Sequence, residues 1–172
     1  GSHWGAELKR AGYDGLIITG ASETPVQIAI VDDEVRIAPA DDLWGLDTYD
    51  AQTAVRQRLG DAVRTVTIGA AGERLSRIAT IHTATSSAAG QGGFGAIMGS
   101  KRLKAISVRG TGQVPVAHPE AFEELIRAVG ADTRAYRSAG DLRGANEQLR
   151  ADRGGRVRAY ACTASCPTPC NR

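Results

Sequence analysis

The stretch GQGGFGAIMGSK, at residues 90–101, decides how the rest of this sequence is interpreted. Five of its twelve residues are glycine, and apolar segments flank it on both sides. Such glycine density indicates a backbone that turns sharply, or that approaches another group too closely for a Cβ. Because bare amide N–H groups with Lys101 and Lys104 close behind suit an anion, the stretch predicts a phosphate-binding site.

Three other interpretations of this stretch compete. Residues 90–95 satisfy the dinucleotide pattern G-x-G-x-x-G, but that pattern needs a long following helix and an acid about 20 residues on. Here the first acid downstream is Glu120. A Walker loop requires Gly-Lys-Ser/Thr in succession, whereas residues 99–101 read Gly-Ser-Lys. A plain glycine-rich surface turn stays open as the third interpretation.

Four segments together resemble one known family, the tungsten-containing aldehyde:ferredoxin oxidoreductases. Residues 90–110 resemble its phosphate-cradling segment, typically AGRGGLGAVMGSKNLKAI, and residues 1–20 resemble its GG-x-F/W-G-x-ELK-x-AGYD segment. Residues 43–49 (LWGLDTY) and 68–73 (IGAAGE) resemble its LWG-x-DTY and IGPAGE. The segments come in the family's order over essentially the whole chain. The sequence is therefore expected to be an internal piece of a considerably longer protein.

The resemblance implies an oxidoreductase with a bis-pterin tungsten or molybdenum centre. Its substrate would be an aldehyde, or a related carboxyl or aryl compound, and its electrons would pass through a four-iron cluster to ferredoxin or an iron–sulfur electron-transfer subunit. A homo-oligomer or a subunit of a complex is expected. The family's acid–base residues are expected beyond Arg172, so no catalytic residue is named.

The cofactor-binding residues that the resemblance implies lie in the glycine stretch and at the start of the chain. They are Gly1, Ser2, His3, Gly90, Gln91, Gly92, Gly93, Gly95 and Lys101. The family usually has arginine at the position of Gln91, and glutamine can hydrogen-bond to phosphate oxygens but brings no charge. Magnesium bridging the pterin phosphates is a further expectation. A purification-tag remnant competes as an interpretation of residues 1–3.

The three cysteines, Cys162, Cys166 and Cys170, form a C-x3-C-x3-C run within the last eleven residues. An odd number so tightly clustered favours metal ligands over disulfides and points to a reducing, cytoplasmic compartment. Iron–sulfur clusters and zinc both remain open from the residues alone. In the resembled family three clustered cysteines, usually C-x2-C-P-x-x-C, and a fourth far downstream hold one 4Fe-4S cluster. The alternative function is a non-catalytic iron–sulfur electron-transfer or phosphate-binding module.

Composition excludes several other classes. The chain of 172 residues is 42% hydrophobic with a net charge of +2, ordinary for a globular protein, and gives no strong attraction to nucleic acid or to a membrane surface. No apolar run approaches the roughly 20 residues that span a bilayer.

The apolar pattern and the resemblance predict an α+β fold. A β-rich pterin-cradling domain with short helices is expected over residues 1–112, and the start of an all-α domain over residues 113–172. Strand-like runs stand at residues 16–19, 26–31, 35–38, 63–68 and 105–108. The second and third runs flank Asp32, Asp33 and Glu34, which predicts a hairpin with an acidic turn.

Two helices have recognisable ends. Thr48 is expected to cap a helix that Gly60 stops. Pro119 begins another, in which Phe122, Leu125, Ile126 and Val129 form one apolar face that is expected to lack some of its packing partners within this chain. His82 is expected to be a structural hydrogen-bonding residue rather than a base.

Overall fold

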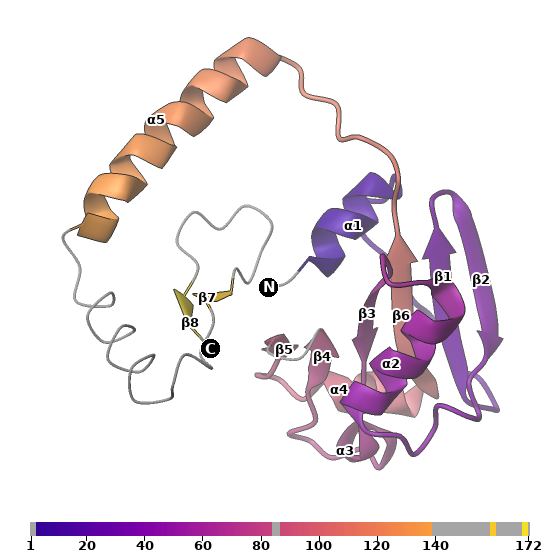
Figure 1. Ribbon diagram of the computed structural model, residues 1–172. Coiled ribbons are helices and arrows are strands. Elements are labelled where there is room, and N and C mark those ends of the chain that lie inside the picture. Colours follow the sequence, from indigo (N-terminus) through magenta and orange to yellow (C-terminus); the bar gives the residue numbers. More distant parts are fainter. Residues whose placement is uncertain (1–2, 84–86, 139–158, 161–169, 172) are drawn as a thin grey trace. The chain divides into compact units, whose positions relative to one another are not determined.

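The computed structural model describes residues 3–83, 87–138, 159–160 and 170–171 (Figure 1). The chain divides into two compact units, Gly1–Gln113 and Val114–Arg172, which we call the sheet unit and the helical unit. Cys162 and Cys166 lie outside the described residues, as do Gly1 and Ser2.

The sheet unit is built on six strands in the order β2-β1-β6-β3-β4-β5. β1 pairs with β6 in parallel, and the other neighbours pair antiparallel. The strands are β1 (Val26–Val31), β2 (Glu34–Pro39), β3 (Arg64–Thr67), β4 (Ile81–Thr83), β5 (Ser87–Ala89) and β6 (Leu103–Arg109). This mixed sheet with short helices confirms the predicted α+β class.

The predicted hairpin is confirmed as β1 and β2, with Asp32 at φ 52° in the turn between them. The acidic turn also fastens the end of the sheet unit, because the Asp32 carboxylate accepts from the Thr111 backbone N–H at 2.6 Å and from its hydroxyl. The strand predicted at residues 16–19 is wrong. Leu16 and Ile18 pack against the core, but Ile17 is 95% exposed and the segment joins no strand of the sheet.

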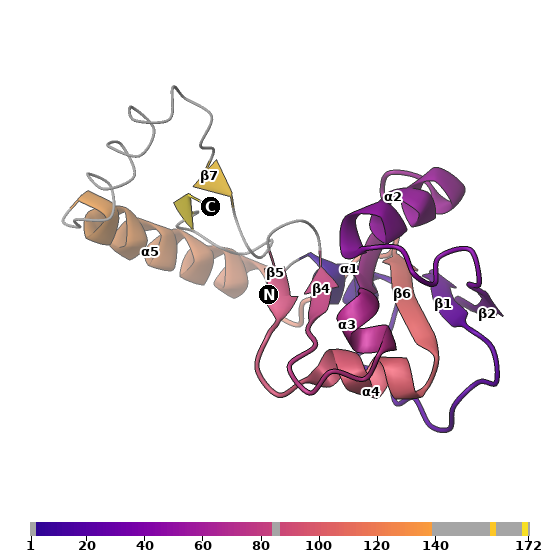
Figure 2. The same cartoon turned by 90° about the horizontal axis from the view of Figure 1, so that it is seen from below.

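Helices cover both faces of the sheet. α1 (Trp4–Arg10) and α4 (Phe94–Ser100) contribute Leu8 and Met98 to the larger core cluster. α2 (Thr48–Leu59) lies on the side opposite α4, as Figures 1 and 2 show, and its Val55 belongs to a second cluster. The larger cluster consists of Leu8, Ala11, Ile28, Ile30, Val66, Ile68, Met98, Leu103, Ile106 and Val108, and the second of Ala40, Leu43, Val55 and Val63.

The N-cap of α2 differs from the prediction by one residue. Asp47 is the cap, and its carboxylate accepts from the backbone N–H groups of Tyr49 at 2.8 Å and Asp50 at 2.9 Å. Thr48 is instead the first helical residue. Asp and Thr are both good cap residues, so their adjacency left the sequence ambiguous at this position. Gly60 ends the helix at φ 90°, as predicted.

The helical unit contains α5 (Pro119–Ser138), β7 (Ala159–Tyr160) and β8 (Cys170–Asn171). α5 begins at Pro119 as predicted. Its apolar face is open: Phe122, Leu125, Ile126 and Val129 are 49–60% exposed. No helix among the described residues is both long and apolar enough to cross a bilayer.

Candidate functional site

The glycine stretch forms a turn between β5 and α4, and we call residues 90–93 the glycine turn (Figure 1). Gly92 and Gly93 have φ of 97° and 67°, and Gly93 is the left-handed N-cap of α4. These dihedrals favour glycine because a Cβ strains the left-handed region. The predicted sharp turn of the backbone is therefore confirmed at these two positions.

Three glycines of the stretch are explained by packing. A Cβ on Gly93 would lie 2.1 Å from the Arg77 carbonyl oxygen, and one on Gly95 would lie 2.6 Å from that of Thr80. A Cβ on Gly99 would lie 1.9 Å from the Gly72 carbonyl oxygen. The glycine density alone predicts that Gly93→Val impairs cofactor retention more than folding. That prediction is wrong, because the backbone of Arg77 occupies the space that a side chain on Gly93 would need.

Three consecutive amides at the turn are left without an acceptor by the residues that the structure describes. The backbone N–H groups of Gly92, Gly93 and Phe94 have no acceptor among the residues that the structure describes, whereas that of Gly95 donates to the Ala79 carbonyl at 3.0 Å. No acidic side chain occurs in residues 90–101. Consecutive unpartnered N–H groups around a left-handed residue suit an anion such as phosphate. The donor set thus fits a phosphate group, and Gly95 lies outside that set.

Neither lysine of the predicted anion site points freely at the glycine turn. The Lys101 ammonium donates to the Gly20 carbonyl at 2.8 Å. Lys104 is completely buried, and its ammonium pairs with the Glu73 carboxylate. The expectation that Lys104 helps to bind an anion is therefore wrong, since its charge is neutralised inside the sheet unit.

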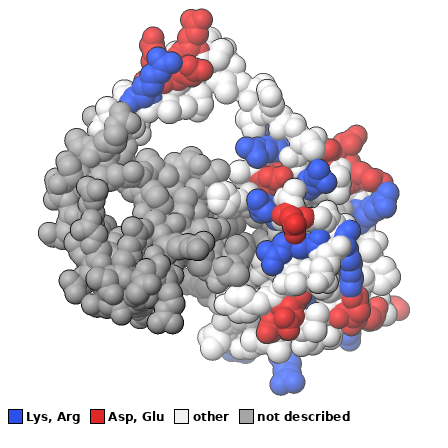
Figure 3. All heavy atoms as spheres, in the orientation of Figure 1, with Lys and Arg blue, Asp and Glu red and all other residues white. Residues whose placement is uncertain are grey.

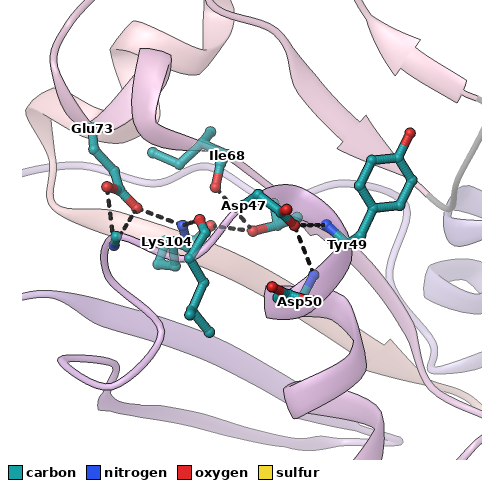
Figure 4. Close-up of polar contacts among 9 residues, drawn as sticks. Asp47, Tyr49, Asp50, Ile68, Glu73 and Lys104 are labelled. Atoms are coloured by element: carbon teal, nitrogen blue, oxygen red, sulfur yellow. Dashed lines mark hydrogen bonds and ion pairs between the residues drawn. The ribbon is translucent and has the colours of Figure 1, made fainter.

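The sequence did not predict the ion pair between Lys104 and Glu73. This pair joins three of the segments that resemble the family (Figure 4). Glu73 ends α3 (Ala70–Glu73), and its two carboxylate oxygens accept from the Gly45 backbone N–H at 3.0 Å. The Lys104 ammonium also donates to the Leu46 carbonyl at 2.8 Å. Lys104 is the extra residue where the β1–β6 register shifts, which turns its side chain out of the regular alternation.

His3, Gln91 and His82 stand on other elements than this pair. His3 is the N-cap residue of α1, and Gln91 is exposed in the glycine turn. His82 lies on β4, and its buried Nδ1 has no hydrogen-bond partner among the described residues. Within the part of the chain that the structure describes, no group of three or more His, Cys, Asp or Glu side chains is placed to hold a metal ion.

Charge on the visible face of the sheet unit is mixed. Figure 3 shows Lys and Arg interspersed with Asp and Glu rather than gathered by sign. Among the described residues of the sheet unit, most ion pairs are exposed, such as Arg36 with Glu34 at 2.6 Å. A site on this face would therefore depend on local donors more than on a long-range field.

The sheet unit is a mixed sheet with helices on both faces, as in an α+β domain, and the amides of its glycine turn lack acceptors among the described residues. Residues 1–110 match the family described as "Aldehyde ferredoxin oxidoreductase, N-terminal domain". The chain belongs to the aldehyde ferredoxin oxidoreductase family.

Its relatives include tungsten enzymes. The chain is 42% identical over 128 residues to the "Tungsten-containing aldehyde ferredoxin oxidoreductase" of Pyrococcus furiosus, covering 74% of this chain and 21% of that protein. The protein of the same name from Thermococcus kodakarensis is 43% identical over the same length, with the same coverage. An "Aliphatic sulfonate oxidoreductase, WOR-like subunit" of P. furiosus is 37% identical over 140 residues, covering 73% of this chain and 22% of that protein.

A solved structure has the same fold. The "Active site complex BamBC of Benzoyl Coenzyme A reductase in complex with 1,5 Dienoyl-CoA" matches with a TM-score of 0.77 and 35% identity. The match covers 83% of this chain and 22% of that chain. The present chain thus spans about a fifth of the length of the relatives it matches.

Proposed function

We propose that this chain is the cofactor-cradling part of a tungsten or molybdenum bis-pterin oxidoreductase that oxidises an aldehyde or converts a related substrate. The observation that carries the proposal is the family match over residues 1–110, which covers nearly all of the sheet unit. Tungsten enzymes among the relatives support the metal.

The residues assigned to the cofactor follow from the donors available. The Gly92, Gly93 and Phe94 amides, with the Gln91 side chain and the Gly90 backbone, would hold a pterin phosphate. Gly1, Ser2 and His3 belong to the same proposal, as does magnesium between the phosphates. When bound, the metal and its dithiolenes supply the redox chemistry. This chain would bind, orient and partly desolvate the cofactor, using neutral donors because Lys101 is held by Gly20.

The cysteine run is assigned to electron transfer. Cys162, Cys166 and Cys170 would supply three thiolates of a 4Fe-4S cluster, which takes four. Ferredoxin or an iron–sulfur subunit would accept the electrons. Because one relative is named as a subunit and one matched structure is a complex, assembly with further copies or subunits is part of the proposal. A reducing, cytoplasmic location fits unpaired thiolates.

Elemental analysis of the purified holoprotein, together with fluorescence detection of oxidised pterin, tests the proposal. Tungsten or molybdenum with pterin, and iron with acid-labile sulfide, is the expected result. Iron and sulfide without pterin would identify an electron-transfer module instead, and zinc alone would identify a structural metal protein. Dye-linked oxidation of a panel of aldehydes then tests the reaction. A pterin-loaded protein inactive on every aldehyde would restrict the proposal to the related substrates.

A further inference from the structure

The buried Lys104–Glu73 pair has no direct part in the proposed cofactor site, yet it lies at a junction of the sheet unit. Side-chain exposure is 0% for Lys104 and 7% for Glu73. Taking two charges out of water is unfavourable, and an apolar pair of similar volume is often as stable. An ion pair differs from an apolar pair in being directional, because each of its hydrogen bonds fixes the position of a particular atom.

Glu73 is the side chain that anchors α3. The helix has four residues, of which Ala70 and Ala71 are exposed. Gly72 packs closely: a Cβ there would lie 2.8 Å from Ile68 and 2.9 Å from the Gly95 carbonyl oxygen. Because Ala70 and Ala71 are exposed, Glu73 is the side chain through which α3 bonds to the bulge residue Lys104 of β6.

The glycine turn rests on α3 by two routes. The first is direct, because α4 packs on α3 through Gly95 and Gly99, both close to the Gly72 backbone. The second runs through residues 74–80, which follow α3 and touch the turn. In that segment the Ala79 carbonyl accepts from the Gly95 N–H at 3.0 Å, and Arg77 lies against Gly93.

We propose that Lys104 and Glu73 are positioning residues, which hold α3 on β6 and thereby keep the Gly92, Gly93 and Phe94 amides aimed at one ligand group. The group they would be aimed at rests on the proposed function. The mechanical link between the pair and the turn does not, since it depends only on contacts within the sheet unit.

The test uses the holoprotein with the double variant Glu73→Gln/Lys104→Met, which removes both charges and keeps an oxygen for the Gly45 N–H. The control is Glu34→Gln/Arg36→Met, which removes an exposed pair on β2. Hydrogen–deuterium exchange of the peptide covering residues 90–96, cofactor content per folded protein and Tm are measured. Residues that orient metal ligands indirectly, the comparable case, typically change metal affinity or activity by roughly 10- to 100-fold when substituted.

In the double variant we expect roughly tenfold or faster exchange within residues 90–96, chiefly at Gly95 and Ala96, whose N–H groups donate to the Ala79 and Gly93 carbonyls. We also expect faster cofactor loss, with the rest of the sheet little changed. The control should match the wild type in all three measurements. Wild-type exchange at residues 90–96, or a uniform acceleration across all strands that follows a fall in Tm, would overturn the inference. If the wild-type protein contains no pterin, the proposed function fails, while the exchange comparison still decides whether the pair positions the turn.

Discussion

At the scale of the residue, the glycines have two separate tasks that one sequence pattern cannot distinguish. Glycine density predicts close approach, but the approaching group can be a ligand or the protein's own backbone. A Cβ on Gly93, Gly95 or Gly99 would collide with backbone, whereas a Cβ on Gly90 would make an ordinary van der Waals contact with Thr80 Cγ2 at 4.0 Å. Which partner each glycine has depends on residues 72–80, whose contact with α4 no local pattern reveals.

Gly93→Ala should lower the free energy of unfolding by about 2–5 kcal/mol. The left-handed conformation contributes about 1–2 kcal/mol of this and overpacking against Arg77 about 1–3 kcal/mol. Urea unfolding measures the change. Gly90→Ala is the matched control in the same turn and should stay within about 0.5 kcal/mol of the wild type. Equal effects of the two substitutions would contradict the packing role of Gly93.

Lys104→Met alone should destabilise the protein more than the double variant Glu73→Gln/Lys104→Met. The single change leaves a buried carboxylate without its cation, which typically destabilises by about 3–5 kcal/mol, while the double change removes both charges. A double-mutant cycle of unfolding free energies measures the difference. A double variant as unstable as Lys104→Met would show that the ammonium's bond to Leu46, and not charge pairing, carries the stability.

At the scale of the element, local sequence patterns predicted a helix or hairpin correctly where the residues that begin, end or turn it are recognisable in the sequence. The β1–β2 hairpin has its turn residues between two apolar runs, and Gly60 and Pro119 mark helix boundaries. Residues 16–19 are as apolar in composition as β1, but they lie outside the sheet. An apolar composition indicates only that a segment is partly buried. Whether the segment joins a sheet also depends on a free strand edge beside it, which tertiary structure decides.

Asp47→Ala should destabilise α2 by about 1 kcal/mol, since two backbone N–H groups lose their acceptor. Thr48→Ala leaves that carboxylate in place and should have a smaller effect. Thermal unfolding followed by circular dichroism compares the two variants. A larger loss for Thr48→Ala would restore threonine as the cap that the sequence first suggested.

At the scale of the whole molecule, the sequence predicted the α+β class and the family, because four motif segments in a fixed order constrain a fold more than any one element does. It did not predict that residues 43–49, residues 68–73 and Lys104 meet in one buried cluster. Their separations in sequence exceed any helical or strand period, so only the sheet order brings them together.

Limited proteolysis with elastase should cut first within residues 112–118. Those residues are exposed and have no regular structure, while Thr111 just before them is fastened to Asp32. Mass spectrometry should identify a product ending near Val114, Val116 or Ala117, with circular dichroism that retains the sheet signal. A first cut inside β1, β3 or β6 would contradict the division into two units.

The place of β6 in the sheet has a consequence for how the protein is made. β6 is the last of the six strands to leave the ribosome, yet it lies between β1 and β3 and joins the β1–β2 hairpin to the β3–β4–β5 meander. Until residues 103–109 emerge, the nascent chain carries two half-sheets, and the facing edges of β1 and β3 have no neighbour. Open edges of this kind pair readily with other chains. Synthesis that pauses before residue 103 would therefore leave both strand edges open to pairing with other chains, whereas synthesis of residues 103–109 closes them.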